Sequence, residues 1–278
     1  MSDALPAVPP LPPVLIGASS KAYLGLAELT RWVQVVTAGL GELGGGQGVA
    51  APRAVPYLCM PAALLGPLGS TLTAAGMLVG AQDVSRFDPG AHTGETTAAL
   101  LAELGASMAM IGHPERARDQ HETLDECRGK ALAATRNGIV PILIAGEPTR
   151  GADPETAIGP QLDVILADVT ADFPVIVAYE PSWAIGQAEP APAEHIAATT
   201  GAIRELLHAR GRHNARIVYG GSAVVGTFTG IVEAANDAAQ RPDGIFLGRG
   251  GLAPENFLAT IEEVRAVNRA SARTSSAN

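Results

Sequence analysis

Residues 174–186 read PVIVAYEPSWAIG, an apolar run of the kind found in parallel strands that are buried on both faces. The run passes directly into Glu180, then a proline, then a short apolar loop that carries Trp183. A glutamate at the end of such a strand is costly unless chemistry or a partner requires it, and the loop has the composition of a hinged lid that excludes water. Glu180 could equally be a surface carboxylate that happens to follow a strand, so this stretch alone leaves both interpretations open.

Similar apolar runs alternate with longer segments of helical period along the chain. The runs cover residues 14–18, 55–60, 77–81, 108–112, 140–145, 174–179, 215–219 and 244–247. The helical segments cover residues 23–38, 62–75, 97–104, 123–137, 154–169, 193–210, 224–239 and 254–268. Eight strands, each followed by a helix, predict an α/β fold of one domain, a closed (β/α)₈ barrel. The alternative is a doubly wound open sheet, which seldom uses so many units and would need a glycine-rich turn after its first strand.

Length and composition agree with one soluble barrel. The chain has 278 residues, and a barrel needs roughly 250. We assign residues 1–12 to a proline-rich lead-in without the features of a secretory signal, 13–268 to the barrel and 269–278 to a disordered tail. No apolar run approaches the roughly 20 residues of a membrane span. These features predict a cytoplasmic protein that does not bind membranes.

The net charge and the cysteine content limit the classes of ligand and partner that the protein is expected to bind. The net charge of −9 and the lack of a Lys/Arg cluster argue against nucleic acid. Cys59 and Cys127 lie far apart without metal-ligand spacing, so both are expected to be free thiols. The negative net charge does not exclude a small anionic substrate, because the site of such a substrate needs only a few local positive groups.

Barrel active sites lie where strands end, so polar residues directly after the predicted strands are the candidates. Glu180 in a pocket that excludes water would have a raised pKa and could remove a proton from a carbon beside a carbonyl. His113 could polarise that carbonyl, although a lone histidine is more often structural. Lys21 could supply a fixed positive charge, although most lysines are surface groups. Glu115 is either a second acid or the partner of a nearby cation.

Two turns at the ends of the last strands are typical of phosphate sites. Gly220-Gly221-Ser222 follows the seventh strand and Gly248 follows the eighth, and both offer backbone N–H groups with little obstruction. Glycine pairs are also common in ordinary turns. The sequence shows no cluster of residues at metal-ligand spacing. The pattern therefore predicts proton transfer on a phosphorylated carbonyl compound without a metal or cofactor.

Several motifs together resemble the triosephosphate isomerase family over residues 13–268. They are AYEPSWAIG (178–186), IGHPER (111–116), GAQD (80–83), HTGE (92–95), VYGGS (218–222) and DGIFLGRGG (243–251). The resemblance implies that Glu180 is the base, His113 a neutral electrophile and Lys21 an electrostatic anchor. It also implies phosphate contacts from Gly186, Ser222 and Gly248, a lid at residues 181–188, and a homodimer formed through the 82–95 loop.

The chain departs from that family's usual pattern where substrate would bind. Ser19 replaces an asparagine before the lysine, and Arg249 replaces the second glycine after the last strand. Both changes resemble a subgroup, the erythrulose-phosphate isomerases. The expected substrate is therefore a four-carbon sugar phosphate, with L-erythrulose 1-phosphate converted to D-erythrulose 4-phosphate. The alternatives are a triosephosphate isomerase of glycolysis and gluconeogenesis, which acts on a three-carbon sugar phosphate, and a barrel that binds without catalysis.

Overall fold

In the computed structural model, which describes residues 10–43, 54–185 and 191–275, parallel strands close into a barrel. Each strand pairs with the next in sequence, and the last pairs with the first, residues 15–18 lying beside residues 244–247. This closure confirms the predicted (β/α)₈ barrel and excludes the open sheet. The strands are β1 Val14–Ser19, β2 Ala54–Met60, β3 Leu78–Ala81, β4 Met108–Ile111, β5 Val140–Ala145, β6 Ile176–Tyr179, β7 Arg216–Tyr219 and β8 Gly244–Leu247.

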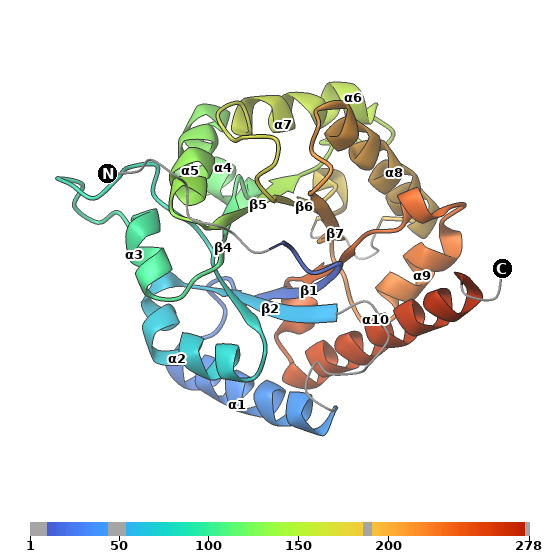
Figure 1. Cartoon of the computed structure of the whole chain (residues 1–278), viewed down its shortest axis with the longest axis horizontal. Coiled ribbons are helices and arrows are strands. Elements are labelled where there is room, and N and C mark those ends of the chain that lie inside the picture. The colour runs from blue at the N-terminus through green and yellow to red at the C-terminus, as the bar shows by residue number, and fades with distance from the viewer. Residues whose placement is uncertain (1–9, 44–53, 186–190, 276–278) are drawn as a thin grey trace.

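Helices surround the barrel as an outer layer, as Figure 1 shows. They are α1 Leu26–Glu42, α2 Ala62–Ala74, α3 Ala98–Glu103, α4 Pro114–Gln120, α5 Leu124–Arg136, α6 Pro154–Ala157, α7 Gly159–Ile165, α8 Ala193–Ala209, α9 Thr227–Ala234 and α10 Pro254–Ser275. The described residues also form short 3₁₀ helices, η1 Ser182–Ala184, η2 Ala238–Gln240 and η3 Arg249–Gly251. No helix among the described residues is long and apolar enough to cross a membrane.

Apolar side chains fill both the inside of the barrel and the layer between strands and helices. Inside, the rings of Tyr57 and Phe246 stack with centroids 5.4 Å apart. Gly17 leaves the space for this pair, because a Cβ at that position would lie 2.1 Å from the Tyr57 ring. The filled interior acts as a rigid support for the residues at the strand ends.

Several helical segments differ from the prediction. The helix expected at 224–239 is divided into α9 and the 3₁₀ helix η2. The helix expected at 154–169 is divided into α6 and α7, because Pro160 in the first turn of α7 has no N–H to continue a longer helix. The helix α4 was not expected, since its sequence PERARDQ has no apolar face and none of its residues is buried. In addition, α10 runs to Ser275, into the segment assigned to the tail.

Candidate active site

The ends of β1, β4, β6, β7 and β8 surround a cavity of about 530 Å³. Its walls include every predicted site residue in the described part of the chain: Ser19, Lys21, His113, Glu115, Glu180, Ser222, Gly248 and Arg249. Gly186 lies outside the described residues. The closed barrel thus brings together groups that are up to 230 positions apart in sequence, from Ser19 to Arg249.

Glu180 is a buried carboxylate directly after β6. Its backbone N–H donates to the carbonyl of Ala145 at 2.9 Å, which continues the β5–β6 pairing by one residue. The side chain is 8% exposed, so burial raises its pKa to about 7, against the opposing charge of Lys21. Gly220 provides the room beside it, because a Cβ there would lie 2.6 Å from Glu180 Oε1. A carboxyl group with this pKa can accept and return a proton near neutral pH.

His113 faces Glu180 and is held as a neutral imidazole. It is the N-cap of α4, where its Nδ1 accepts the backbone N–H of Glu115 at 3.1 Å. Burial and the charge of Lys21 lower its pKa to about 4. The ring proton therefore lies on Nε2, which is buried, has no hydrogen-bond partner among the described residues, and is 4.0 Å from Glu180 Oε2. His113 can thus donate to a ligand oxygen.

Lys21 is held in the site by Glu115, whose Oε1 lies 2.8 Å from the lysine Nζ. Partial burial raises the pKa of Glu115, but the hydrogen bond and charge of Lys21 outweigh it, so the pKa lies below its ordinary value. An ionised Glu115 is a partner for the ammonium group, which favours the second of the two roles that the sequence left open.

The two glycine-containing turns line the same cavity. Ser222 has a left-handed backbone with φ of 45°, and its Oγ donates to the carbonyl of Ala184 at 3.4 Å. Gly248 lies beside Lys21, since a Cβ there would be 3.8 Å from the lysine Cε. Arg249 follows at the mouth of the cavity with an exposed side chain. This part of the cavity combines open backbone with two nearby cations, which suits a phosphate group.

Two further polar residues at strand ends were missed. Glu147, 1% exposed, follows β5 by two positions and accepts from Tyr179 Oη at 3.0 Å and Trp183 Nε1 at 2.8 Å. Gln82 follows β3 and lines a second cavity of about 520 Å³, which shares Ser19, Lys21 and His113 with the first. Both residues follow predicted strands by one or two positions, so the rule that selected Glu180 and His113 also selects them.

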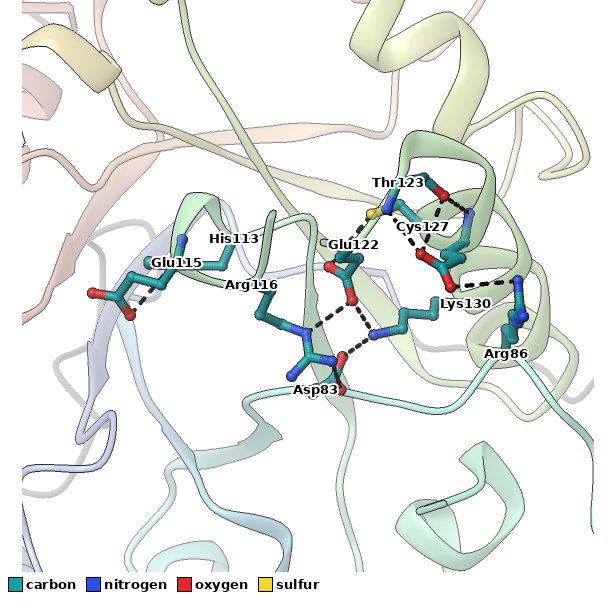
Figure 2. Close-up of polar contacts among 10 residues, drawn as sticks. Asp83, Arg86, His113, Glu115, Arg116, Glu122, Thr123, Cys127 and Lys130 are labelled. Atoms are coloured by element: carbon teal, nitrogen blue, oxygen red, sulfur yellow. Dashed lines mark hydrogen bonds and ion pairs between the residues drawn. The ribbon is translucent and has the colours of Figure 1, made fainter. Parts of the chain in front are cut away.

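An ion cluster beside the second cavity joins α4, α5 and Asp83, the residue after Gln82 (Figure 2). Arg116 Nη2 lies 2.8 Å from Asp83, and its Nε lies 2.8 Å from Glu122. Lys130 of α5 binds the same two carboxylates, at 2.6 Å from Asp83 and in contact with Glu122. The cluster fixes the short helix whose N-cap is His113.

Among the described residues, no group of three or more His, Cys, Asp or Glu side chains lies close enough to hold a metal ion. The groups that converge are a buried carboxylate of raised pKa, a neutral imidazole that can donate from Nε2, and an ammonium group. Together they can move a proton between neighbouring carbons while stabilising the negative charge that forms on oxygen.

The chain is similar to several known proteins. The chain is 34% identical over 257 residues to the L-erythrulose-1-phosphate isomerase of Pectobacterium atrosepticum, covering 89% of this chain and 94% of that one. It is 37% identical over 226 residues to the triosephosphate isomerase of Granulibacter bethesdensis, covering 77% and 88%. The crystal structure of triosephosphate isomerase from Bartonella henselae matches with a TM-score of 0.71 and 25% identity, covering 91% of this chain and 99% of that one.

The family model described as triosephosphate isomerase matches residues 14–264, which include every strand of the barrel and both phosphate-type turns. The match and the isomerase relatives agree with the chemistry that the converging groups can perform. The chain belongs to the triosephosphate isomerase family and is a sugar-phosphate isomerase of the ketose/aldose type.

Proposed function

We propose that this isomerase interconverts L-erythrulose 1-phosphate and D-erythrulose 4-phosphate. The observation that carries the proposal is that Ser19 and Arg249, the two residues typical of the erythrulose-phosphate subgroup, both line the cavity of Glu180 and His113. The relative from Pectobacterium atrosepticum, which bears that activity in its name, supports the same choice.

In the proposed reaction, Glu180 removes the proton from C3 of the sugar, and the electron pair of that bond forms the C2–C3 double bond. The C2 carbonyl oxygen becomes an enediolate oxygen, to which His113 donates from Nε2, while Lys21 stabilises the charge. The hydroxyl proton on the C3 oxygen passes to the C2 oxygen through His113, which leaves the enediolate charge on the C3 oxygen. Glu180 then returns its proton to C2: the electron pair of the C2–C3 double bond forms the new C–H bond, and the C3 oxygen becomes a carbonyl. Atoms and electrons balance within the sugar.

The phosphate is proposed to bind the backbone amides of Ser222 and Gly248, with the positive charges of Lys21 and Arg249 nearby. Their place around one cavity supports this assignment. The proposed lid at residues 181–188 and the proposed contact from Gly186 extend beyond the described residues. Within them, residues 181–185 form the turn that carries η1, and Trp183 of this turn bonds to Glu147.

The extra hydroxymethyl group of the tetrulose requires space beside C3. Ser19, which is 3% exposed, is smaller than an asparagine by about one amide group and is proposed to leave that space. The second cavity begins at Ser19 and Lys21, on the side where Gln82 lies, so it extends the room at this end of the site.

A triosephosphate isomerase activity of glycolysis and gluconeogenesis is the second candidate, because the relative from Granulibacter bethesdensis bears that name and the proposed base, electrophile and lysine serve both reactions. Steady-state kinetics on both substrates separates the two. We expect kcat/KM to be at least about tenfold higher for the tetrulose phosphate, a difference of about 1.4 kcal/mol in transition-state binding. A higher kcat/KM for glyceraldehyde 3-phosphate would contradict the tetrulose assignment.

We also propose that the protein is a cytoplasmic homodimer that pairs through the 82–95 loop. The loop is ordered by a stack in which the rings of Phe87 and His92 lie 4.1 Å apart and Arg86 lies over the phenylalanine ring. The buried free thiols of Cys59 and Cys127 are compatible with a reducing compartment. Sedimentation velocity is expected to give twice the mass of the chain, and a monomer at micromolar concentration would contradict the dimer. Cell fractionation tests the location.

A further inference from the structure

The turn that carries Lys21 has a backbone conformation that ordinary residues avoid. Lys21 has φ of 42°, in the left-handed region that favours glycine. Other residues persist there at functional sites only when surrounding contacts hold them. The turn after β1 therefore needs contacts from outside itself.

Gln82, the residue after β3, supplies such contacts through its side-chain amide. Its Nε2 lies 3.1 Å from Ser20 Oγ and 3.2 Å from the carbonyl of Lys21. The same nitrogen lies 3.2 Å from the carbonyl of Cys59 on β2 and 3.4 Å from Ser19 Oγ. An amide nitrogen has two protons, which are shared here among four acceptors. One side chain thus ties the turn after β1 to the end of β2.

The same amide determines what Ser19 can offer to a ligand. Ser19 Oγ accepts the backbone N–H of Lys21 at 3.3 Å in addition to the Gln82 amide. A hydroxyl oxygen has two lone pairs and one proton. Since donors approach both lone pairs, the proton is what remains for an oxygen of the substrate.

We propose that Gln82 is a positioning residue for the isomerisation, whose amide fixes the turn so that the Lys21 ammonium and the Ser19 hydroxyl face the substrate. The inference rests on the proposed isomerase mechanism and holds for either sugar phosphate. Without the amide, Lys21 can relax toward a negative φ, and its Nζ then moves away from the reacting groups.

The variant Gln82→Met tests this, because methionine keeps the length of the side chain and removes both amide protons. Its matched control is Gln240→Met, the same change on η2, where Gln240 Oε1 accepts the N–H of Asn236 at 3.0 Å outside the cavity lining. For Gln82→Met we expect kcat to fall about tenfold or more, because a misplaced group is costly in a preorganised site. KM is expected to rise by a smaller factor than kcat falls, because the backbone amides proposed to bind phosphate stay in place and only the nearby charge of Lys21 is displaced. The control is expected to keep both constants.

The pH profile gives a readout that a purely structural role would not move. Lys21, His113 and Glu115 face Glu180, and the charge of Lys21 lowers the pKa of Glu180. Displacing Lys21 therefore raises that pKa, so the acid limb of kcat/KM in Gln82→Met should shift to higher pH. A loss of folding stability alone would lower the melting temperature and leave the limb unmoved.

The variant Ser20→Ala keeps the test open if Gln82→Met fails to fold, because it removes the acceptor at 3.1 Å and leaves Gln82 in place. A smaller loss of kcat and a smaller shift of the acid limb, both in the same direction, are expected. Wild-type kcat and an unmoved acid limb in a folded variant would overturn the positioning role. A wild type that isomerises neither sugar phosphate would overturn the proposed function instead, and this inference with it.

Discussion

The carboxyl group of Glu180 carries a stability cost that its proposed role explains. Burial raises its pKa from 4.5 to about 7, so the folded protein binds a proton that the unfolded chain releases. Between these two values the folded state holds more protons, and stability falls as pH rises. Above pH 7 the full penalty, about 3 kcal/mol, remains because both states are ionised.

The variant Glu180→Gln should therefore be more stable than the wild type at pH 8 and similar to it at pH 4. It should also lose about two to four orders of magnitude in kcat, because the base is gone. Urea unfolding at the two pH values measures the first effect, and steady-state assays measure the second. Equal stabilisation at both pH values would show that the carboxyl group is not strained by burial.

Ser19 and Arg249 are the residues on which the choice of sugar depends. The double variant Ser19→Asn/Arg249→Gly should move the ratio of kcat/KM toward the triose phosphate by about tenfold or more, since the larger amide fills the space proposed for the hydroxymethyl group. Val225→Ala, on the exposed loop after β7, is a control that should leave the ratio unchanged. A ratio that stays constant in the double variant would place the discrimination elsewhere.

At the scale of elements, the turn after β7 leaves room for the side chain of Glu180, the proposed base. A Cβ on Gly220 would lie 2.6 Å from Glu180 Oε1, whereas a Cβ on Gly230 in α9 would have no heavy atom within 4 Å. Gly220→Ala should lower kcat about a hundredfold by displacing the carboxylate. Gly230→Ala should keep kcat and stabilise the protein slightly through helix propensity. Similar kinetics in the two variants would mean that the carboxylate has room to move.

The strands were predictable from the sequence because buried parallel strands are continuous apolar runs, and each of these runs corresponds to a strand within one or two residues. Helices whose limits depend on capping residues or on a single proline were not predictable in this way. The helix α4 begins at Pro114 with His113 as its cap and has no apolar face to reveal it. The division of the helix expected at 154–169 depends on a single proline, Pro160.

Of the candidate site, the strand-end rule located the groups that face the cavity. It did not reveal how they are held. That Glu115 partners Lys21, and that Gln82 contacts the turn after β1, depends on side-chain directions across the barrel mouth. No local pattern encodes such directions, because each contact joins residues from different strands.

At the scale of the whole molecule, the ion cluster of Asp83, Arg116, Glu122 and Lys130 joins separate βα units. Lys130 is buried and contacts two carboxylates, so Lys130→Met should leave Glu122 short of positive charge and destabilise the fold by about 3 kcal/mol. Arg128→Met on the same helix removes an exposed pair with Asp168 and should change stability little. Urea titration of both variants measures the difference. Equal midpoints would show that the cluster does not hold the fold together.

Pairing of β1 with β8 also determines the stage of synthesis at which the chain can become catalytically active. Lys21 is translated more than 200 residues before Gly248, yet the two lie side by side only when β1 and β8 have paired. A nascent chain that still has β8 inside the ribosome contains Glu180, His113 and Lys21 but lacks half of the wall proposed for phosphate. We therefore expect a partly folded chain without β8 to have no isomerase activity. A truncated translation product would contain the acid–base groups but would not bind and convert sugar phosphates.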